Sequence, residues 1–175
     1  MRQVEIAGLA LEASSGSPVV VLRETEAPHR VLPIFVGGSE ATAIGLALAG
    51  ETPSRPLTYD LMATLMQSLD AHLDRVEVTE VRDGAFLAEV EVTVPSGGRR
   101  LDTRPSDAIA LAVRLNAPLF VSDAVLDEAG AVLPDQPTPV DPAAIDEQVA
   151  AFRSELDTLD PADFGTDDDD GAAIN

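Results

Sequence analysis

Short apolar runs separated by turn signals dominate the first 36 residues of the chain. Residues 3–12 alternate imperfectly between apolar and polar positions, and the runs 19–22 and 31–36 are short and almost wholly apolar. This pattern predicts three β-strands joined by turns. Pro33 lacks a backbone N–H group, so we expect the third strand to lie at a sheet edge or to begin there.

Two helices are predicted next. Gly37 and Gly38 interrupt the third strand, Ser39 is a candidate N-cap, and Gly50 is a stop signal for the first helix. The second helix is predicted to begin near residues 55–56 and to run to about residue 69. Leucines repeat every fourth position along it: Leu57, Leu61, Leu65 and Leu69.

A hairpin and a short strand occupy the middle of the chain. The runs 75–82 and 85–94 flank Asp83-Gly84, a dipeptide typical of a tight hairpin turn. A further strand is predicted over 99–103. A third helix follows from Pro105, which suits a first helical turn because its missing N–H would have no partner there.

The order of these elements favours one fold class. After the third helix, the segment 116–118 contains a proline and 119–121 is a short apolar run, predicted to be a strand. Hairpins and helices are grouped rather than strictly alternating. We therefore expect an α+β fold with a mixed, largely antiparallel sheet and helices packed on it, rather than a doubly wound α/β sheet.

The last quarter of the chain differs in composition from the rest. Residues 134–142 contain four prolines and are expected to be a linker after a domain over residues 1–133. Residues 143–160 are predicted to form an amphipathic helix that docks on its own domain or on a protein partner. Residues 161–175 are expected to be a disordered acidic tail. The apolar stripe of the predicted helix consists of Ile145, Val149, Phe152, Leu156 and Leu159.

Charge and cysteine content narrow the functional classes. The 175 residues carry a formal net charge of −20, so nucleic acid would be repelled at long range unless arginines or cations intervene. The chain has no cysteine, which excludes disulfides, thiolate metal sites and cysteine nucleophiles. No apolar run approaches the roughly 18–20 residues that cross a bilayer. We expect a soluble cytoplasmic protein without membrane partners.

Polar side chains gather at the three predicted helix starts. The groups are Ser39 and Glu40; Arg55, Thr58, Tyr59 and Asp60; and Asp102, Arg104, Ser106 and Asp107. If these helix starts converge, their free amides, arginines and carboxylates form one pocket that suits phosphate or a divalent cation. The same residues also suit helix capping and structural ion pairs. Residue types alone leave both interpretations open, although they favour the structural one.

Three segments of this sequence resemble the bifunctional nuclease domain (BFN, DUF151). They cover residues 32–41, 55–61 and 102–112, in order and with suitable spacing, within a likeness that extends over about residues 3–130. The resemblance implies an α+β domain, DNase and RNase activity, and assembly into homodimers or larger homo-oligomers. Family members commonly have histidine where this chain has Tyr59. A phenol is a poorer general base than imidazole at neutral pH.

The resulting first hypothesis is a nuclease that hydrolyses phosphodiester bonds of DNA and RNA. Its candidate catalytic residues are Asp102, Asp107, Asp60 and Glu40. Its candidate substrate-binding residues are Arg55, Arg104, Ser106, Thr58 and Tyr59. A divalent ion, Mg²⁺ or Mn²⁺, is expected on Asp102 and Asp107. The alternative is a binding or regulatory module without catalysis, which uses the same pocket for an anion and the C-terminal helix for a partner.

Overall fold

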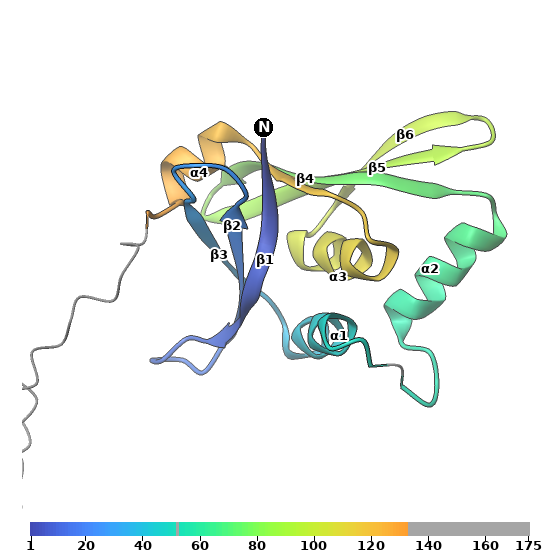
Figure 1. Cartoon of the computed structure of the whole chain (residues 1–175), viewed down its shortest axis with the longest axis horizontal. Coiled ribbons are helices and arrows are strands. Elements are labelled where there is room, and N and C mark those ends of the chain that lie inside the picture. The colour runs from blue at the N-terminus through green and yellow to red at the C-terminus, as the bar shows by residue number, and fades with distance from the viewer. Residues whose placement is uncertain (52, 133–175) are drawn as a thin grey trace, which may run out of the picture. The chain divides into compact units, whose positions relative to one another are not determined.

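Seven strands form one open sheet in the computed structural model of the chain, which describes residues 1–51 and 53–132 (Figure 1). The order across the sheet is β3-β2-β1-β7-β4-β5-β6. All neighbours are antiparallel except β4 and β7, which are parallel. The strands are β1 (Arg2–Leu11), β2 (Pro18–Glu24), β3 (Val31–Phe35), β4 (His72–Arg82), β5 (Ala85–Val94), β6 (Gly97–Thr103) and β7 (Leu119–Val121). The predicted α+β class with a largely antiparallel sheet is confirmed.

The structure confirms two predictions about the backbone: the edge position of the strand that contains Pro33, and the hairpin turn at Asp83-Gly84. The strand that contains Pro33 is an edge strand, paired with β2 on one side. Within the described residues, its other side makes one isolated bridge, between Val31 and Ala131. The β4–β5 hairpin turns at Asp83 and Gly84, which both have positive φ, 51° and 78°. Those backbone angles are the ones that an Asp-Gly turn supplies most easily.

The described residues contain four helices: α1 (Gly38–Leu48), α2 (Thr58–Ser68), α3 (Pro105–Leu115) and α4 (Asp123–Ala129). Two predicted helix starts were wrong. The N-cap of α1 is Gly37, and the hydroxyl of Ser39 donates to the Glu40 carboxylate instead of capping the helix. Helix α2 begins three residues after Arg55, because Leu57 is still extended. The helix α4 was not predicted; its cap is Ser122, whose hydroxyl accepts from the Val125 amide.

Helix α3 is the most deeply buried helix, and it begins and ends as the sequence predicts. Pro105 occupies the first turn, and Asn116 ends the helix in the left-handed conformation at φ 53°. The segment Ala108–Ala112 is buried against strands of the sheet. This burial fixes the start of α3, and therefore Arg104 and Asp107, relative to the sheet.

One compact unit, Met1–Leu133, contains all of these elements. The linker expected at 134–142, the helix at 143–160 and the tail at 161–175 lie outside the described residues. Among the helices that are described, none combines the length and the apolar character that crossing a bilayer requires.

Candidate functional site

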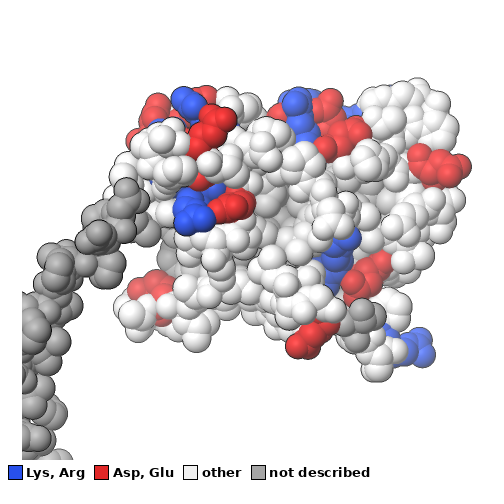
Figure 2. Space-filling model, in the orientation of Figure 1, with Lys and Arg blue, Asp and Glu red and all other residues white. Residues whose placement is uncertain are grey.

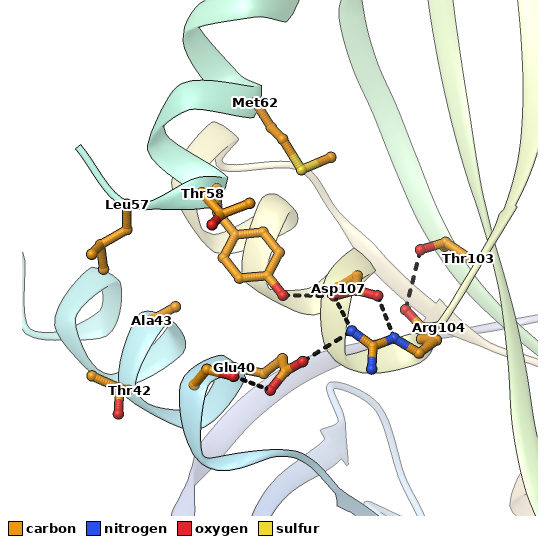
Figure 3. Close-up of a pocket in the computed structure, with 11 residues that line it drawn as sticks. Glu40, Thr42, Ala43, Leu57, Thr58, Met62, Thr103, Arg104 and Asp107 are labelled. Carbon is orange, nitrogen blue, oxygen red and sulfur yellow. Dashed lines mark hydrogen bonds and ion pairs between the residues drawn. The ribbon is translucent and has the colours of Figure 1, made fainter.

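The starts of α1, α2 and α3 meet around a pocket of about 700 Å³ (Figure 3). Helix α1 contributes Glu40, helix α2 contributes Tyr59, and Asp107 lies in the first turn of α3. The convergence of three helix starts that the sequence suggested is therefore present. The complete lining is Ser39, Glu40, Thr42, Ala43, Leu57, Thr58, Tyr59, Met62, Thr103, Arg104 and Asp107.

Arg104 lies between two carboxylates at one end of the pocket. Its Nε donates to Oδ2 of Asp107 at 2.6 Å, and its Nη2 donates both to Oδ1 of Asp107 and to Oε1 of Glu40 at 2.9 Å. The remaining nitrogen, Nη1, makes no hydrogen bond to any residue in the described part of the chain. The group of three carries a net charge of −1 and keeps one donor available for a ligand.

Tyr59 fixes the position of Asp107 from the side of α2. Its hydroxyl donates to Oδ1 of Asp107 at 2.6 Å, and its ring is almost fully buried. The guanidinium group of Arg114 lies over the Tyr59 ring, with its central carbon 5.6 Å from the ring centre. Tyr59 therefore links the pocket to the ion pair of Arg114 that lies behind it.

The electrostatics of the pocket keep its carboxylates ionised and its phenol neutral. The Arg104 hydrogen bonds lower the pKa of Asp107, in spite of partial burial. The Ser39 hydroxyl is the largest contribution that lowers the pKa of Glu40, and Arg104 adds to it. Burial, and then the hydrogen bond and charge of Asp107, raise the pKa of Tyr59 well above that of a free phenol. Tyr59 is thus a hydrogen-bond donor at neutral pH and not a base.

Asp60 lies outside this pocket, although the sequence grouped it with Asp107. Its Oδ1 accepts from Nε of Arg114 at 2.6 Å, and its Oδ2 accepts from the Leu57 amide at 2.8 Å. These bonds lower the pKa of Asp60, with Arg114 as the larger cause. Asp60 therefore caps α2 and neutralises a nearly buried arginine.

Asp102 is also separated from the pocket, for a reason that follows from strand geometry. In β6, Thr103 pairs with the buried Ala88 and lines the pocket. Asp102 pairs with Glu89, and successive side chains of a strand point to opposite faces. The Asp102 side chain is exposed on the outer face of the sheet. The structure does not bring Asp102 and Asp107 together.

The other candidate substrate-binding residues are divided between the pocket and its surroundings. Thr58 and Tyr59 line the pocket. Arg55 is exposed in the segment before α2 and does not line it. Ser106 is buried and lines a separate pocket of about 350 Å³, of which Arg104 is also a wall.

Sequence reasoning missed several residues that shape the site, among them Arg114, Met62 and Thr103. Arg114 follows Asp107 by two helical turns, so the α3 periodicity places it on the same side of that helix. Its neighbours Tyr59 and Asp60 are on another helix, however, and the sequence gives no signal for that pairing. Met62 and Thr103 form apolar and polar parts of the pocket wall. Met62 lies outside the three segments that carry the resemblance, and Thr103 lies within the segment 102–112 but was not a candidate site residue.

The two carboxylates of the pocket define what it can hold. In residues 1–51 and 53–132, no cluster of three or more Asp, Glu, His or Cys side chains could hold a metal ion. Mg²⁺ is often bound by only one or two carboxylates, together with water and substrate phosphates. Glu40 and Asp107 are two carboxylates in one pocket, and in this structure both accept hydrogen bonds from the same nitrogen of Arg104.

Comparison with known proteins places these residues inside a recognised domain. A family model described as "Bifunctional nuclease domain" matches residues 20–134, which include the whole pocket lining. An uncharacterized protein of Mycobacterium tuberculosis is 36% identical over 165 residues, covering 94% of this chain and 98% of that protein.

Two plant proteins are more distant relatives. Bifunctional nuclease 2 of Oryza sativa is 26% identical to this chain, with 65% of the chain and 36% of the rice protein covered. Bifunctional nuclease 1 of Arabidopsis thaliana is 26% identical, with 60% of the chain and 33% of that protein covered. The chain therefore spans only about a third of the length of the relatives whose names state an activity.

Proposed function

Because this chain belongs to the bifunctional nuclease domain family, we propose that it hydrolyses phosphodiester bonds of DNA and RNA in the pocket at the starts of α1, α2 and α3. The observation that carries this proposal is the position of Arg104 between Glu40 and Asp107. A guanidinium with a free donor and two ionised carboxylates are the groups that phosphodiester hydrolysis uses.

Each of these residues has a distinct role in the proposal. The free Nη1 of Arg104 binds a non-bridging phosphate oxygen and offsets the negative charge that develops there. Glu40 and Asp107 accept hydrogen bonds from the attacking water and orient it. Tyr59 and Ser39 are positioning residues, because they contact the carboxylates rather than the site of reaction.

A divalent cation is part of the proposal because of the charge balance. The residues Glu40, Arg104 and Asp107 together carry a net charge of −1, which opposes the binding of a phosphodiester without a further cation. The lowered pKa values of Asp107 and Glu40 also make these carboxylates weak bases. Mg²⁺ or Mn²⁺ held by Glu40 and Asp107 would supply a bound water of lowered pKa.

Nuclease assays of the full chain test the proposal. Single- and double-stranded DNA and RNA are each incubated with Mg²⁺, with Mn²⁺ and with EDTA. We expect cleavage with a divalent ion, and a loss of about 100-fold or more in Asp107→Asn and in Arg104→Gln. Asp70→Asn makes the same change in an exposed loop and serves as the control. Asp102→Asn should leave cleavage unchanged, and an equal loss there would contradict the site assignment.

The second candidate function is an anion-binding regulatory module without catalysis. It is favoured because the polar groups of the pocket already form hydrogen bonds with one another. Asp107 accepts hydrogen bonds from both Arg104 and Tyr59. This candidate predicts no cleavage under any ion condition. It also predicts a rise in melting temperature with inorganic phosphate or a nucleoside monophosphate, and loss of that rise in Arg104→Gln.

A further inference from the structure

A second pocket lies next to the candidate site, and Arg104 is a wall of both. This side pocket is found where the end of β3, the β4–β5 hairpin and the start of α3 meet, and its walls include Phe35, Phe86 and Ser106. Its volume of about 350 Å³ is at the small end of the range for ligand pockets in proteins. A ligand whose anionic group is bound by Arg104 can therefore place one further group of modest size in the side pocket.

The hydroxyl of Ser106 lines the side pocket without a partner. Ser106 is only 8% exposed, and its hydroxyl makes no hydrogen bond to any of the residues 1–51 and 53–132. Buried polar groups in folded proteins almost always have a hydrogen-bond partner, because an unpaired one is costly. The group that completes the bonding of this hydroxyl must therefore occupy the side pocket.

The rest of the side pocket is aromatic and apolar. Among the described residues that line it, Arg104 is the one that carries a charge. Phe35 and Phe86 supply aromatic surface, and Phe35 is 61% exposed. An exposed aromatic ring offers a face on which a flat ring system can stack. The side pocket therefore suits an uncharged flat ring with polar atoms at its edge, joined to an anionic group.

Long-range attraction contributes little to nucleic-acid binding by this chain, whose formal net charge is −20. Most arginines of the described residues form ion pairs with Asp or Glu. Figure 2 shows most of the blue residues on the face that it draws beside red ones. Proteins hold single-stranded nucleic acid by a positively charged groove and by stacking bases on aromatic side chains. Since the first contribution is weak here, contacts with a base must supply more of the binding.

We propose that the side pocket binds one unpaired nucleobase of the nucleic acid whose phosphate is held by Arg104, so that the chain acts on single strands in preference to duplexes. This inference rests on the proposed function, which places the phosphate at Arg104. The base stacks on Phe35, and the Ser106 hydroxyl forms a hydrogen bond to a polar atom at the edge of the base. A base in a duplex is already stacked and paired, so it must leave the double helix before it can enter such a pocket.

A fluorescent nucleotide measures binding of the base separately from cleavage. The probe is 2-aminopurine riboside 5′-monophosphate, whose emission falls when its base stacks and which contains no phosphodiester bond. We expect saturable quenching by the full chain, and a binding constant weakened about two- to tenfold in Phe35→Leu, which keeps apolar area but loses the ring face. Phe35→Trp should retain binding. Phe120→Leu makes the same change on β7, outside both pockets, and is the matched control.

Ser106→Ala separates a contact with the base from a role in the fold. Removing a hydroxyl that bonds within the protein would lower the melting temperature, whereas removing an unpartnered one would not. We expect a melting temperature equal to or above that of the wild type, and probe binding weakened about two- to tenfold. A lower melting temperature with unchanged probe binding would overturn the assignment of Ser106 to the base.

Nuclease assays test the strand preference. Single-stranded oligonucleotides should be cleaved faster than duplexes of the same sequence. Phe35→Leu should lower kcat/KM on single strands, but not on strands of equal length whose bases are replaced by abasic sites. Equal cleavage of single strands and duplexes would overturn the preference.

The two assays together distinguish failure of this inference from failure of the proposed function. If only the proposed function fails, no strand is cleaved, yet the probe is quenched and Phe35→Leu weakens its binding. If only this inference fails, cleavage is lost in Arg104→Gln, while Phe35→Leu changes neither cleavage nor probe binding. Absence of quenching by the wild-type chain would also overturn the assignment of the side pocket to a base.

Discussion

Tyr59 and Asp107 are 48 positions apart in the chain, and the Tyr59 hydroxyl donates a hydrogen bond of 2.6 Å to Oδ1 of Asp107. This bond joins the start of α2 to the first turn of α3. It also means that the phenol is a donor to a carboxylate that Arg104 already holds. The contact orients Asp107 and leaves Tyr59 no role as a base.

Tyr59→Phe tests this orientation. We expect the free energy of unfolding to fall by about 1–2 kcal/mol, because a hydrogen bond to a charged acceptor is lost while the ring remains packed. Urea unfolding of both proteins measures the difference. Nuclease activity should fall as well, because Asp107 loses one of its two partners. An unchanged free energy of unfolding would mean that this hydrogen bond does not stabilise the folded chain.

Asp60→Asn tests the separation of Asp60 from the chemistry. Arg114 is nearly buried and loses its carboxylate partner, so we expect unfolding to require about 1–2 kcal/mol less. The asparagine oxygen can still accept from the Leu57 amide. Activity should change by less than about twofold at a temperature where the variant is folded. Strong loss of activity without loss of stability would return Asp60 to the catalytic group.

Six carboxyl groups of the described residues have pKa values lowered in the folded chain, and three of them lie in or beside the candidate site: Glu40, Asp60 and Asp107. Each of these carboxylates stabilises the folded state at pH values above about 4, the pKa of the group in the unfolded chain. This stabilisation is lost as the pH falls toward and through the lower pKa of the group in the folded chain. We expect nearly constant stability from these groups between about pH 8 and 5 and a decline below about pH 4. Chemical unfolding across this range measures it, and Asp107→Asn should flatten the acidic decline.

The sequence predicted elements wherever one local signal determined the backbone. Pro105 and Asn116 bound α3, and Asp83-Gly84 formed the hairpin turn, because each acts through its own backbone angles or missing donor. Side-chain partners were harder to predict, because they depend on which elements meet. Glu40, Tyr59 and Asp107 were correctly placed in one pocket.

Asp102 shows why the rest of the site could not be predicted in the same way. It adjoins the Arg104–Asp107 segment in the sequence, yet strand alternation turns its side chain to the opposite face of β6. Asp60 likewise adjoins Tyr59, but one residue along a helix rotates the side chain by about 100°, toward Arg114 instead of Asp107. Residues that are close in sequence were correctly predicted to share the start of α3, but closeness in sequence did not predict which side chains share the pocket.

Gly37→Ala tests the geometry of the site without changing any charge. The φ and ψ angles of Gly37, −70° and 160°, suit alanine, so the backbone gains no strain. The added Cβ, however, would collide with Oε2 of Glu40, and the carboxylate must move away from Ser39 and Arg104. We expect a melting temperature within a few degrees of wild type and a loss of roughly tenfold or more in nuclease activity, because misplacement by about 1 Å is costly.

Gly38→Ala is the matched control for this prediction. Gly38 is the next residue, and nothing lies within 4 Å of the Cβ that alanine would add there. Activity assays and thermal unfolding of the two variants side by side therefore separate the position of Glu40 from general effects on the start of α1. Equal activity in both variants would mean that Glu40 need not lie against Arg104 for the chemistry, and would leave Asp107 as the one carboxylate that the reaction requires.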